Sequence, residues 1–175
     1  MSNERVPEAG KSEDDCRQFR SGTAAHQGED AARLPEVDLD VLNGHLGYLM
    51  RRAQLWMVRD FNRRVTSLGV GAAQYSVLVV IGANPGLSQM AVSRALGIER
   101  GRLVHVLDSL EARQLIQRRK SMSRHSHALH LTPAGRAALN EAKLIGQEHE
   151  KYVAQWIGPE QRERLLRLLR GFAFG

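Results

Sequence analysis

The side chains of this chain best suited to chemistry are cations near its middle. Arg100, Arg102 and His105 share the polar side of a predicted helix whose other side is apolar. An arginine can bind two acceptors of a guanine, and a histidine can donate or accept at one base edge. These three residues are therefore predicted to reach the major groove of DNA.

A second set of polar side chains suits phosphate rather than bases. Ser88, Gln89 and Arg94 belong to the preceding predicted helix, whose first backbone N–H groups can bind an anion. Further basic residues flank or form a predicted hairpin after the second helix, and they are Arg118, Arg119, Lys120 and Arg124. Along the DNA backbone these cations would supply affinity without sequence preference.

The elements that must position these residues follow in a recognisable order. A short helix over residues 87–96, with Ser88 as its cap, is separated by Gly97 from a second helix over residues 98–113. Four residues of the second helix are expected to face inward, and they are Leu103, Val106, Leu107 and Leu110. A two-stranded hairpin then runs from Ile116 to Thr132. This order is that of a winged helix-turn-helix.

The flanking segments are predicted to be helical. Apolar residues at helical spacing predict a long helix that begins at Asp38 or Asp40 and ends near Gly69. A helix over residues 72–83 is apolar on nearly all sides and should be central. Thr132 is placed to cap a helix that continues towards Trp156.

The last predicted helix begins after residues 158–160 and has a wide apolar stripe. Its members are Leu165, Leu166, Leu168, Leu169 and Phe172. A helix at a chain end can rest only one side on its own domain, so this stripe predicts a dimer surface. The fold class is thus mainly α with a small β-hairpin wing, a winged helix-turn-helix joined to a helical dimerisation stem.

Charge is distributed unevenly along the 175 residues, whose net charge is +6. Residues 1–37 hold five basic and eight acidic residues, whereas the remaining 138 hold 20 and 11. The segment over residues 94–124 alone has eight basic and three acidic residues, which favours a polyanionic partner for the folded part. The tail has little periodic apolar pattern, and we expect it to be disordered.

Several classes of protein are excluded by composition. No apolar run is long enough to span a bilayer, and the first residues do not resemble a secretory signal, so a cytoplasmic protein without membrane contact is expected. The single cysteine, Cys16, lies in the acidic tail, where it can form no internal disulfide and has no activating partner for a thiol switch. No nucleophile, nucleotide or paired-carboxylate motif occurs, so neither an enzyme nor a cofactor is predicted.

Several local motifs resemble the MarR family of transcription factors over roughly residues 40–173. The matching stretches are QYSVL at residues 74–78, NPGLSQ at 84–89, LDSLE at 107–111 and LHLTPAG at 129–135. The resemblance implies a homodimer that binds pseudo-palindromic double-stranded DNA, with a small-molecule effector between stem and winged domain.

The wing departs from the family pattern. Family wings usually read Asp-Arg-Arg, and the matching residues here are Ser123, Arg124 and His125. The position that enters the minor groove in the family is His125, so either Arg124 takes its place or His125 makes a pH-sensitive contact.

A cluster of histidines raises a metal site as an alternative. On a strand His125 and His127 would share one face while His130 points to the other, and no carboxylate or thiolate stands nearby. We therefore predict no metal ligands, with a metal-responsive regulator of the same fold as the alternative.

An effector pocket is predicted on the first long helix. Its apolar side is Leu46, Leu49, Ala53 and Trp56, with His45 and Arg52 on one margin. An apolar cleft edged by a cation suits an aromatic carboxylate or a related acyl thioester. The expected ligand residues are His45, Leu49, Arg52, Trp56, Tyr75 and Ser76, all of which could equally be core or dimer contacts.

The sequence thus predicts a dimeric, sequence-specific DNA-binding regulator, most simply a repressor released by a small organic ligand. The expected divisions are a disordered tail at 1–37, a dimerisation stem at 38–68 and 137–175, and a DNA-binding domain at 69–136. A non-specific architectural DNA-binding protein and an inactive dimerisation module remain as alternatives.

Overall fold

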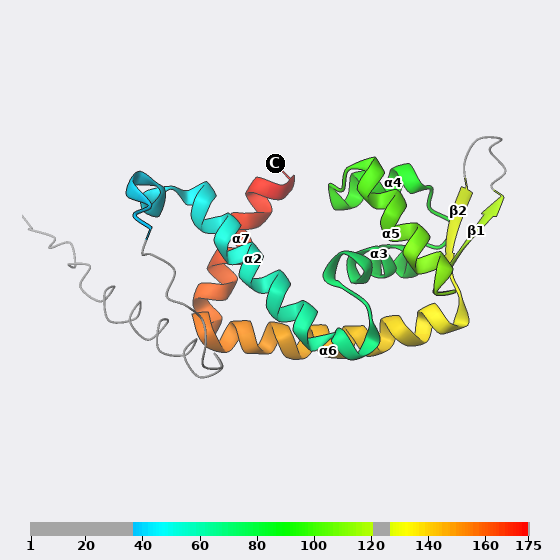
Figure 1. Cartoon of the computed structure of the whole chain (residues 1–175). Coiled ribbons are helices and arrows are strands. Elements are labelled where there is room, and N and C mark those ends of the chain that lie inside the picture. Colours follow the sequence, from blue (N-terminus) through cyan, green and yellow to red (C-terminus); the bar gives the residue numbers. More distant parts are fainter. Residues whose placement is uncertain (1–36, 121–126, 175) are drawn as a thin grey trace, which may run out of the picture. The chain divides into compact units, whose positions relative to one another are not determined.

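The computed structural model describes residues 37–120 and 127–174. The chain divides into two units, with the boundary between Asn43 and Gly44. The described part of the first unit contains the start of a 3-10 helix, η2 (Asp40–Gly44). The second unit contains every other element, in the order α2 (Leu46–Arg64), η3 (Thr66–Leu68), α3 (Ala72–Ala83), α4 (Gln89–Leu96), α5 (Arg100–Ala112), β1 (Ile116–Lys120), β2 (His127–Leu131), α6 (Pro133–Ile157) and α7 (Pro159–Phe174) (Figure 1). The mainly helical fold with a β-hairpin wing is confirmed. The predicted acidic tail and Cys16 lie outside the described residues.

The first long helix begins later than predicted. The carboxylate of Asp38 accepts a hydrogen bond from the backbone N–H of Asp40 at 2.9 Å, and Asp40 itself has a φ of +46°. Because this local bond and the left-handed backbone both interrupt an α-helix, the chain forms η2 and starts α2 only at Leu46. The prediction that Asp38 or Asp40 caps this helix was wrong.

The core is centred on α3, as its apolar composition predicted. Val77, Leu78 and Ile81 are fully buried, and α3 packs against α4, α5, α6 and β2. Three of the four predicted inward residues of α5, Leu103, Leu107 and Leu110, are buried with them, while Val106 is half-buried. We call α3, α4, α5, β1 and β2 the winged lobe.

One serine and one threonine cap the two helices next to the wing, α4 and α6, as predicted. The hydroxyl of Ser88 accepts from the N–H of Ala91 at 3.2 Å, and α4 begins one residue later. The hydroxyl of Thr132 accepts from the N–H of Gly135 at 2.9 Å, with Pro133 as the first residue of α6.

The wing is an antiparallel pair in which Ile116 lies opposite Leu131 and Lys120 lies opposite His127. The backbone before α4 extends this pairing, since Gly86 N–H donates to Leu129 and Leu129 N–H donates to Leu87, both at 2.9 Å. At the base of the wing, a Cβ on Gly135 would lie 1.8 Å from the carbonyl oxygen of Leu115. Only glycine permits this approach of α6 to the wing.

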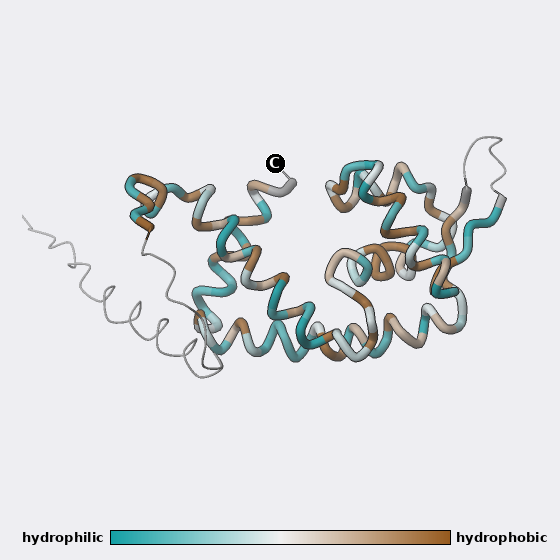
Figure 2. Tube along the Cα trace, viewed as in Figure 1, coloured by the Kyte–Doolittle hydropathy of each residue, from teal (hydrophilic) through white to brown (hydrophobic). Residues whose placement is uncertain are grey.

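The remaining helices, α2, α6 and α7, are the stem helices, and they leave many apolar side chains uncovered. Leu165, Leu168 and Phe172 of α7 are 42%, 58% and 72% exposed, and Leu46 and Leu49 of α2 are 61% and 48% exposed. Figure 2 shows hydrophobic residues alternating with hydrophilic ones along these helices. No helix among the described residues combines the length and apolar character that crossing a membrane requires.

Candidate nucleic-acid interface and effector cavity

The outward side of α5 carries all three side chains predicted to reach DNA bases. Arg100, Arg102 and His105 are exposed, whereas the opposite side of the helix is buried in the core. The Arg100 guanidinium lies against the sulfur of Met90 on α4, with Nη2 3.2 Å from Sδ. The helix therefore presents polar side chains outward on a rigid base.

Glu99 caps α5, a role that the sequence analysis missed. Its carboxylate accepts hydrogen bonds from the N–H groups of Gly101 and Arg102 at 2.9 and 3.0 Å. These two backbone donors hold the pKa of Glu99 below its ordinary value. The cap could have been read from the acidic residue just before the helix.

The residues predicted to bind phosphate on α4 lie at its start and end. Ser88 is half-buried at the N-cap, where its oxygen accepts from Ala91 while its O–H can still donate. Gln89 is half-buried beside it, and Arg94 is exposed in the last turn.

Arg118 is engaged within the protein, unlike the free phosphate ligand that the sequence suggested. Its guanidinium donates to Asp108 and to Glu111 of α5, both at 2.6 Å, and its side chain is only 22% exposed. These ion pairs fix β1 to the helix that carries the predicted base-reading residues. Arg119 is exposed and Lys120 ends β1, whereas Arg124 and His125 lie outside the described residues.

Histidines do not assemble a metal site in the described part of the chain. Within residues 37–120 and 127–174, no group of three His, Cys, Asp or Glu residues lies close enough together to hold a metal ion. His125, the remaining member of the histidine cluster, falls outside those ranges.

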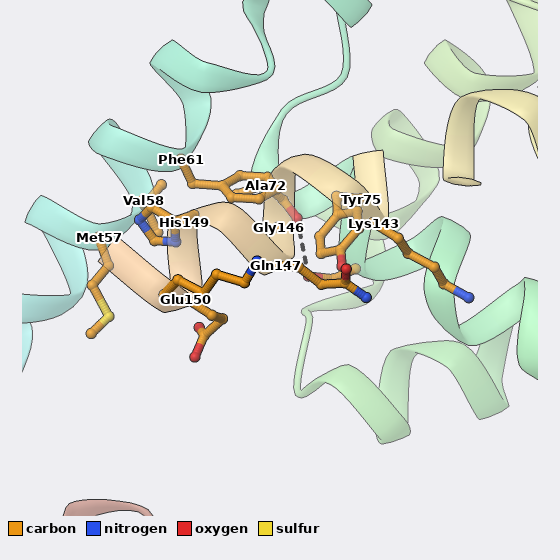
Figure 3. Close-up of a pocket in the computed structure, with 12 residues that line it drawn as sticks. Met57, Val58, Phe61, Ala72, Tyr75, Lys143, Gly146, Gln147, His149 and Glu150 are labelled. Atoms are coloured by element: carbon orange, nitrogen blue, oxygen red, sulfur yellow. Dashed lines mark hydrogen bonds between the residues drawn. The ribbon is translucent and has the colours of Figure 1, made fainter. Parts of the chain in front are cut away.

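A cavity of about 620 Å³ opens where α2, α3 and α6 meet (Figure 3). Its wall contains the aromatic rings of Phe61, Tyr75 and His149. The ring centroid of Phe61 lies 5.1 Å from that of Tyr75 and 5.7 Å from that of His149. The other lining residues are Met57, Val58, Ala72, Ser76, Lys143, Gly146, Gln147, Glu150 and Lys151. The volume and the aromatic wall suit a planar organic ligand.

Two hydroxyl groups line this cavity, those of Tyr75 and Ser76. The Tyr75 hydroxyl lies against Gly146, where an added Cβ would meet its oxygen at 3.0 Å. Burial, helped by the Glu150 carboxylate, raises the pKa of Tyr75, so the phenol stays protonated and can donate. Ser76 donates to the carbonyl of Ala72 at 3.0 Å and keeps its oxygen as an acceptor.

The structure brings only two of the six predicted ligand residues to this cavity, Tyr75 and Ser76. His45 just before α2, and Leu49 and Arg52 in its first turns, are exposed. Trp56 stacks on Tyr152 with ring centroids 6.3 Å apart. Sequence reasoning missed the α6 side of the wall, Gly146 and His149. Both continue the stripe of Leu139 and Ala142 at helical spacing, which could have revealed them.

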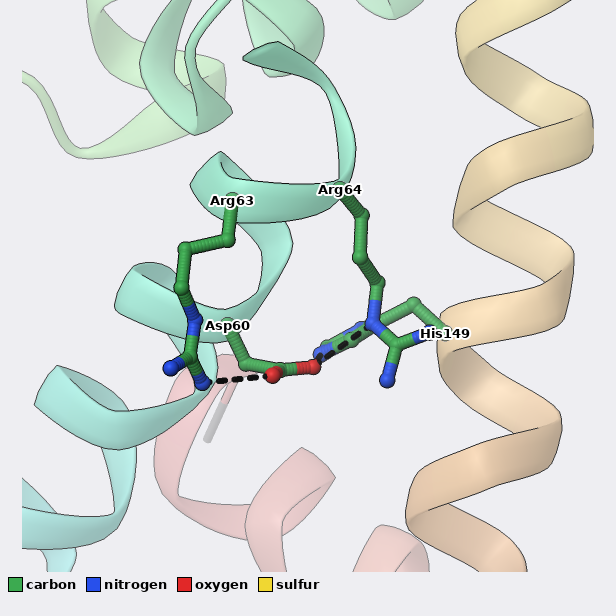
Figure 4. Close-up of polar contacts among 4 residues, drawn as sticks. All are labelled: Asp60, Arg63, Arg64 and His149. Atoms are coloured by element: carbon green, nitrogen blue, oxygen red, sulfur yellow. Dashed lines mark hydrogen bonds and ion pairs between the residues drawn. The ribbon is translucent and has the colours of Figure 1, made fainter. Parts of the chain in front are cut away.

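An ionic cluster around the buried side chains of Asp60 and His149 lies beside the cavity (Figure 4). The Asp60 carboxylate accepts from Arg63 at 2.8 Å and from Arg64 at 2.7 Å, and His149 Nε2 lies 3.5 Å from it. Burial alone would raise the pKa of Asp60, but hydrogen bonds from the two arginines outweigh it and hold that pKa below its ordinary value. Burial lowers the pKa of His149 more than Asp60 raises it, so the imidazole is neutral at pH 7.

A second hollow, of about 820 Å³, connects the stem side with α5. It is lined by Arg102 and His105, and it shares Val58, Ala72 and Ser76 with the cavity. Hydrogen bonds cross the same region. Asn62 of α2 accepts from Ala72 N–H at 2.8 Å, and Gln74 of α3 donates to Ser109 of α5 at 2.9 Å.

Comparison with known proteins gives consistent results. The MarR family model matches residues 68–122. A regulatory protein assigned to the hcr operon of Thauera aromatica is 34% identical over 148 residues, covering 83% of this chain and 89% of that protein.

Solved structures agree with this sequence match. The transcriptional repressor CouR bound to a 23-mer DNA duplex is 39% identical with a TM-score of 0.73, and CouR bound to p-coumaroyl-CoA is 38% identical with a TM-score of 0.74. Each match covers 79% of this chain and 99% of the CouR chain. The fold, the extent of these matches and the exposed polar helix together show that this chain belongs to the MarR family of transcriptional regulators.

Proposed function

We propose that this chain is a homodimeric repressor that binds a pseudo-palindromic operator and is released by an aromatic acyl-CoA thioester. The observation that carries the proposal is α5, which exposes Arg100, Arg102 and His105 and buries its opposite side. The likeness to DNA-bound CouR at 39% identity supports it. The relatives and solved structures described above are transcriptional regulators, so we assign the chain no catalytic activity. Binding to an operator favours a cytoplasmic location.

The dimer follows from the uncovered stem helices. The apolar side chains of α7 are exposed, and a second copy of the chain would bury them in a symmetric interface formed by the same surface of both copies. In this proposal the stem comprises residues 38–68 and 137–175, and the DNA-binding domain comprises residues 69–136.

DNA contacts divide into bases and phosphates. Arg100, Arg102 and His105 would read base edges, while Ser88, Gln89 and Arg94 would hold the backbone. Arg119 and Lys120, with Arg124 and His125, would contact phosphates or the minor groove from the wing. Arg118 would orient the wing through α5 rather than touch DNA.

The effector site is the cavity between α2, α3 and α6. CouR at 38% identity binds p-coumaroyl-CoA, and the aromatic wall of this cavity offers a matching surface for a flat acyl group. Tyr75 and Ser76 would provide its polar contacts, while Lys143 and Lys151 at the edge are positioned to attract an anionic ligand.

Release requires the effector to bind the DNA-incompetent arrangement more tightly. Val58, Ala72 and Ser76 form part of both hollows, so a ligand that displaces them from one side changes the surroundings of Arg102 and His105 on the other. The hydrogen bond from the Ala72 N–H to Asn62 and the one from Gln74 to Ser109 link α2 and α3 to α5.

The test measures binding to DNA from upstream of the chain's own gene and to scrambled DNA, with and without p-coumaroyl-CoA. We expect salt-sensitive preference for the native DNA and loss of affinity with the thioester but not with free coenzyme A. Gly146→Val places a side chain against the Tyr75 hydroxyl, inside the cavity. This variant should keep DNA binding and lose the response to p-coumaroyl-CoA. Equal affinity for both DNAs would instead favour an architectural protein.

A further inference from the structure

The outward side of α5 carries an apolar residue among its polar ones. Gly101, Val104, His105 and Asp108 are separated by three and four residues, so they lie on one face, and all are exposed. Val104 is 41% exposed, whereas Leu103 beside it is 2% exposed. Val104 is therefore not part of the hydrophobic core, unlike Leu103.

The surroundings of Val104 leave it accessible to a large partner. Asp108 on the same face is held by Arg118 at 2.6 Å, and Arg100 is turned to Met90 on α4. Gly101, one turn before Val104, has no side chain to cover this face of the helix. A base edge can thus approach the helix closely beside Val104.

Thymine offers the one apolar group that bases display in the major groove, its 5-methyl. We propose that Val104 reads the 5-methyl group of a thymine in each half of the operator. This inference rests on the proposed function, in which α5 lies in the major groove. Burying one methyl-sized group predicts about a fourfold preference for thymine in each half-site.

The experiment first selects an operator from duplexes with a randomised centre, using the full-length chain. Each thymine is then replaced by uracil, which lacks only the 5-methyl group. Kd is measured for the wild type and for Val104→Ala, a change at an exposed helical position where alanine favours the helix.

In the wild type, we expect replacement of a single thymine by uracil, at one particular position in either half-site, to weaken binding about fourfold. Val104→Ala should lose this sensitivity, because the contact requires both a methyl group of Val104 and the 5-methyl group of thymine. Val41→Ala makes the same side-chain change outside the winged lobe, and it should keep the uracil penalty.

Two results separate this inference from the proposed function. If an operator is selected but uracil has no effect, or if Val104→Ala keeps the full penalty at every thymine, the inference is overturned and the proposed function stands. If the pool yields no preferred sequence, the proposed function fails and the inference falls with it.

Discussion

The winged lobe and the stem helices treat apolar side chains in opposite ways. In the lobe, Val77, Leu78, Ile81 and Leu107 are completely buried by their own chain. In the stem, Leu168 and Phe172 of α7 keep more than half of their surface exposed. The lobe therefore has a closed core, to which α6 adds Leu139, whereas α7 leaves an apolar surface that the proposed dimer partner would cover.

This difference explains how the two regions can serve different purposes. A lobe with a closed core holds α5 rigidly, as reading of base edges requires. The stem side contains the cavity and the ionic cluster of Asp60, where α2 and α6 meet. In the proposed dimer, the stem helices could change their packing against the partner without unfolding the lobe.

The largest expected effect is on the lobe itself. Leu107→Ala removes a fully buried side chain from the inner face of α5 and should lower the free energy of unfolding by about 2–5 kcal/mol. Urea denaturation measures it. The same change at Leu144, which is 64% exposed on α6, should stay within about 0.5 kcal/mol. Equal losses at both positions would contradict the difference between the two regions.

A charge on the apolar stripe of α7 should weaken dimerisation rather than the stability of the winged lobe. Leu168→Glu puts a carboxylate where the partner's apolar surface would lie, so we expect self-association to weaken at least about tenfold. Sedimentation velocity over a range of protein concentrations measures this. Arg167→Glu, on the other side of α7, should leave the dimer intact, and a dimer unaffected by Leu168→Glu would place the interface elsewhere.

The sequence predicted the lobe far better than the stem, for a physical reason. Caps such as Ser88 and Thr132 and the inward leucines of α5 are local signals, and each one directs the same fold that the core then fixes. Asp38 and Asp40 gave an equally good cap signal, yet a local bond between them accompanies a 3-10 turn, and α2 begins only at Leu46. Short polar side chains compete with the helix wherever no packing decides the outcome.

The two candidate sites show the same contrast. Arg100, Arg102 and His105 are exposed on α5 because one helix positions all three. The cavity needs three helices, and its α6 side, Gly146 and His149, depends on how α6 crosses α2 and α3. Arg118 resembled a phosphate ligand because the sequence does not show that Asp108 and Glu111 face it.

The two caps allow a finer comparison of the regions. Ser88→Ala, at the start of α4, should cost about 1 kcal/mol of unfolding free energy. Thr132→Ala, at the start of α6, should cost more, because its hydroxyl also donates to the carbonyl of Gln114 at 2.6 Å. Urea denaturation at one protein concentration measures both losses. A greater loss at Ser88 would mean that the second bond of Thr132 does not stabilise the fold.

The smallest expected effect is a slope of stability against pH, and it arises beside the cavity. Burial lowers the pKa of His149 in the folded chain, so the unfolded chain binds a proton more readily. The contribution of the neutral imidazole is therefore complete above about pH 6.5 and is lost as the pH falls from there through the folded pKa. His149→Gln cannot take up this proton. Its unfolding free energy should fall less than that of the wild type between pH 7 and pH 5, as measured by urea denaturation at each pH. A steeper fall in the variant would mean that the Asp60 carboxylate, 3.5 Å from His149 Nε2, stabilises the charged imidazole more than burial opposes it.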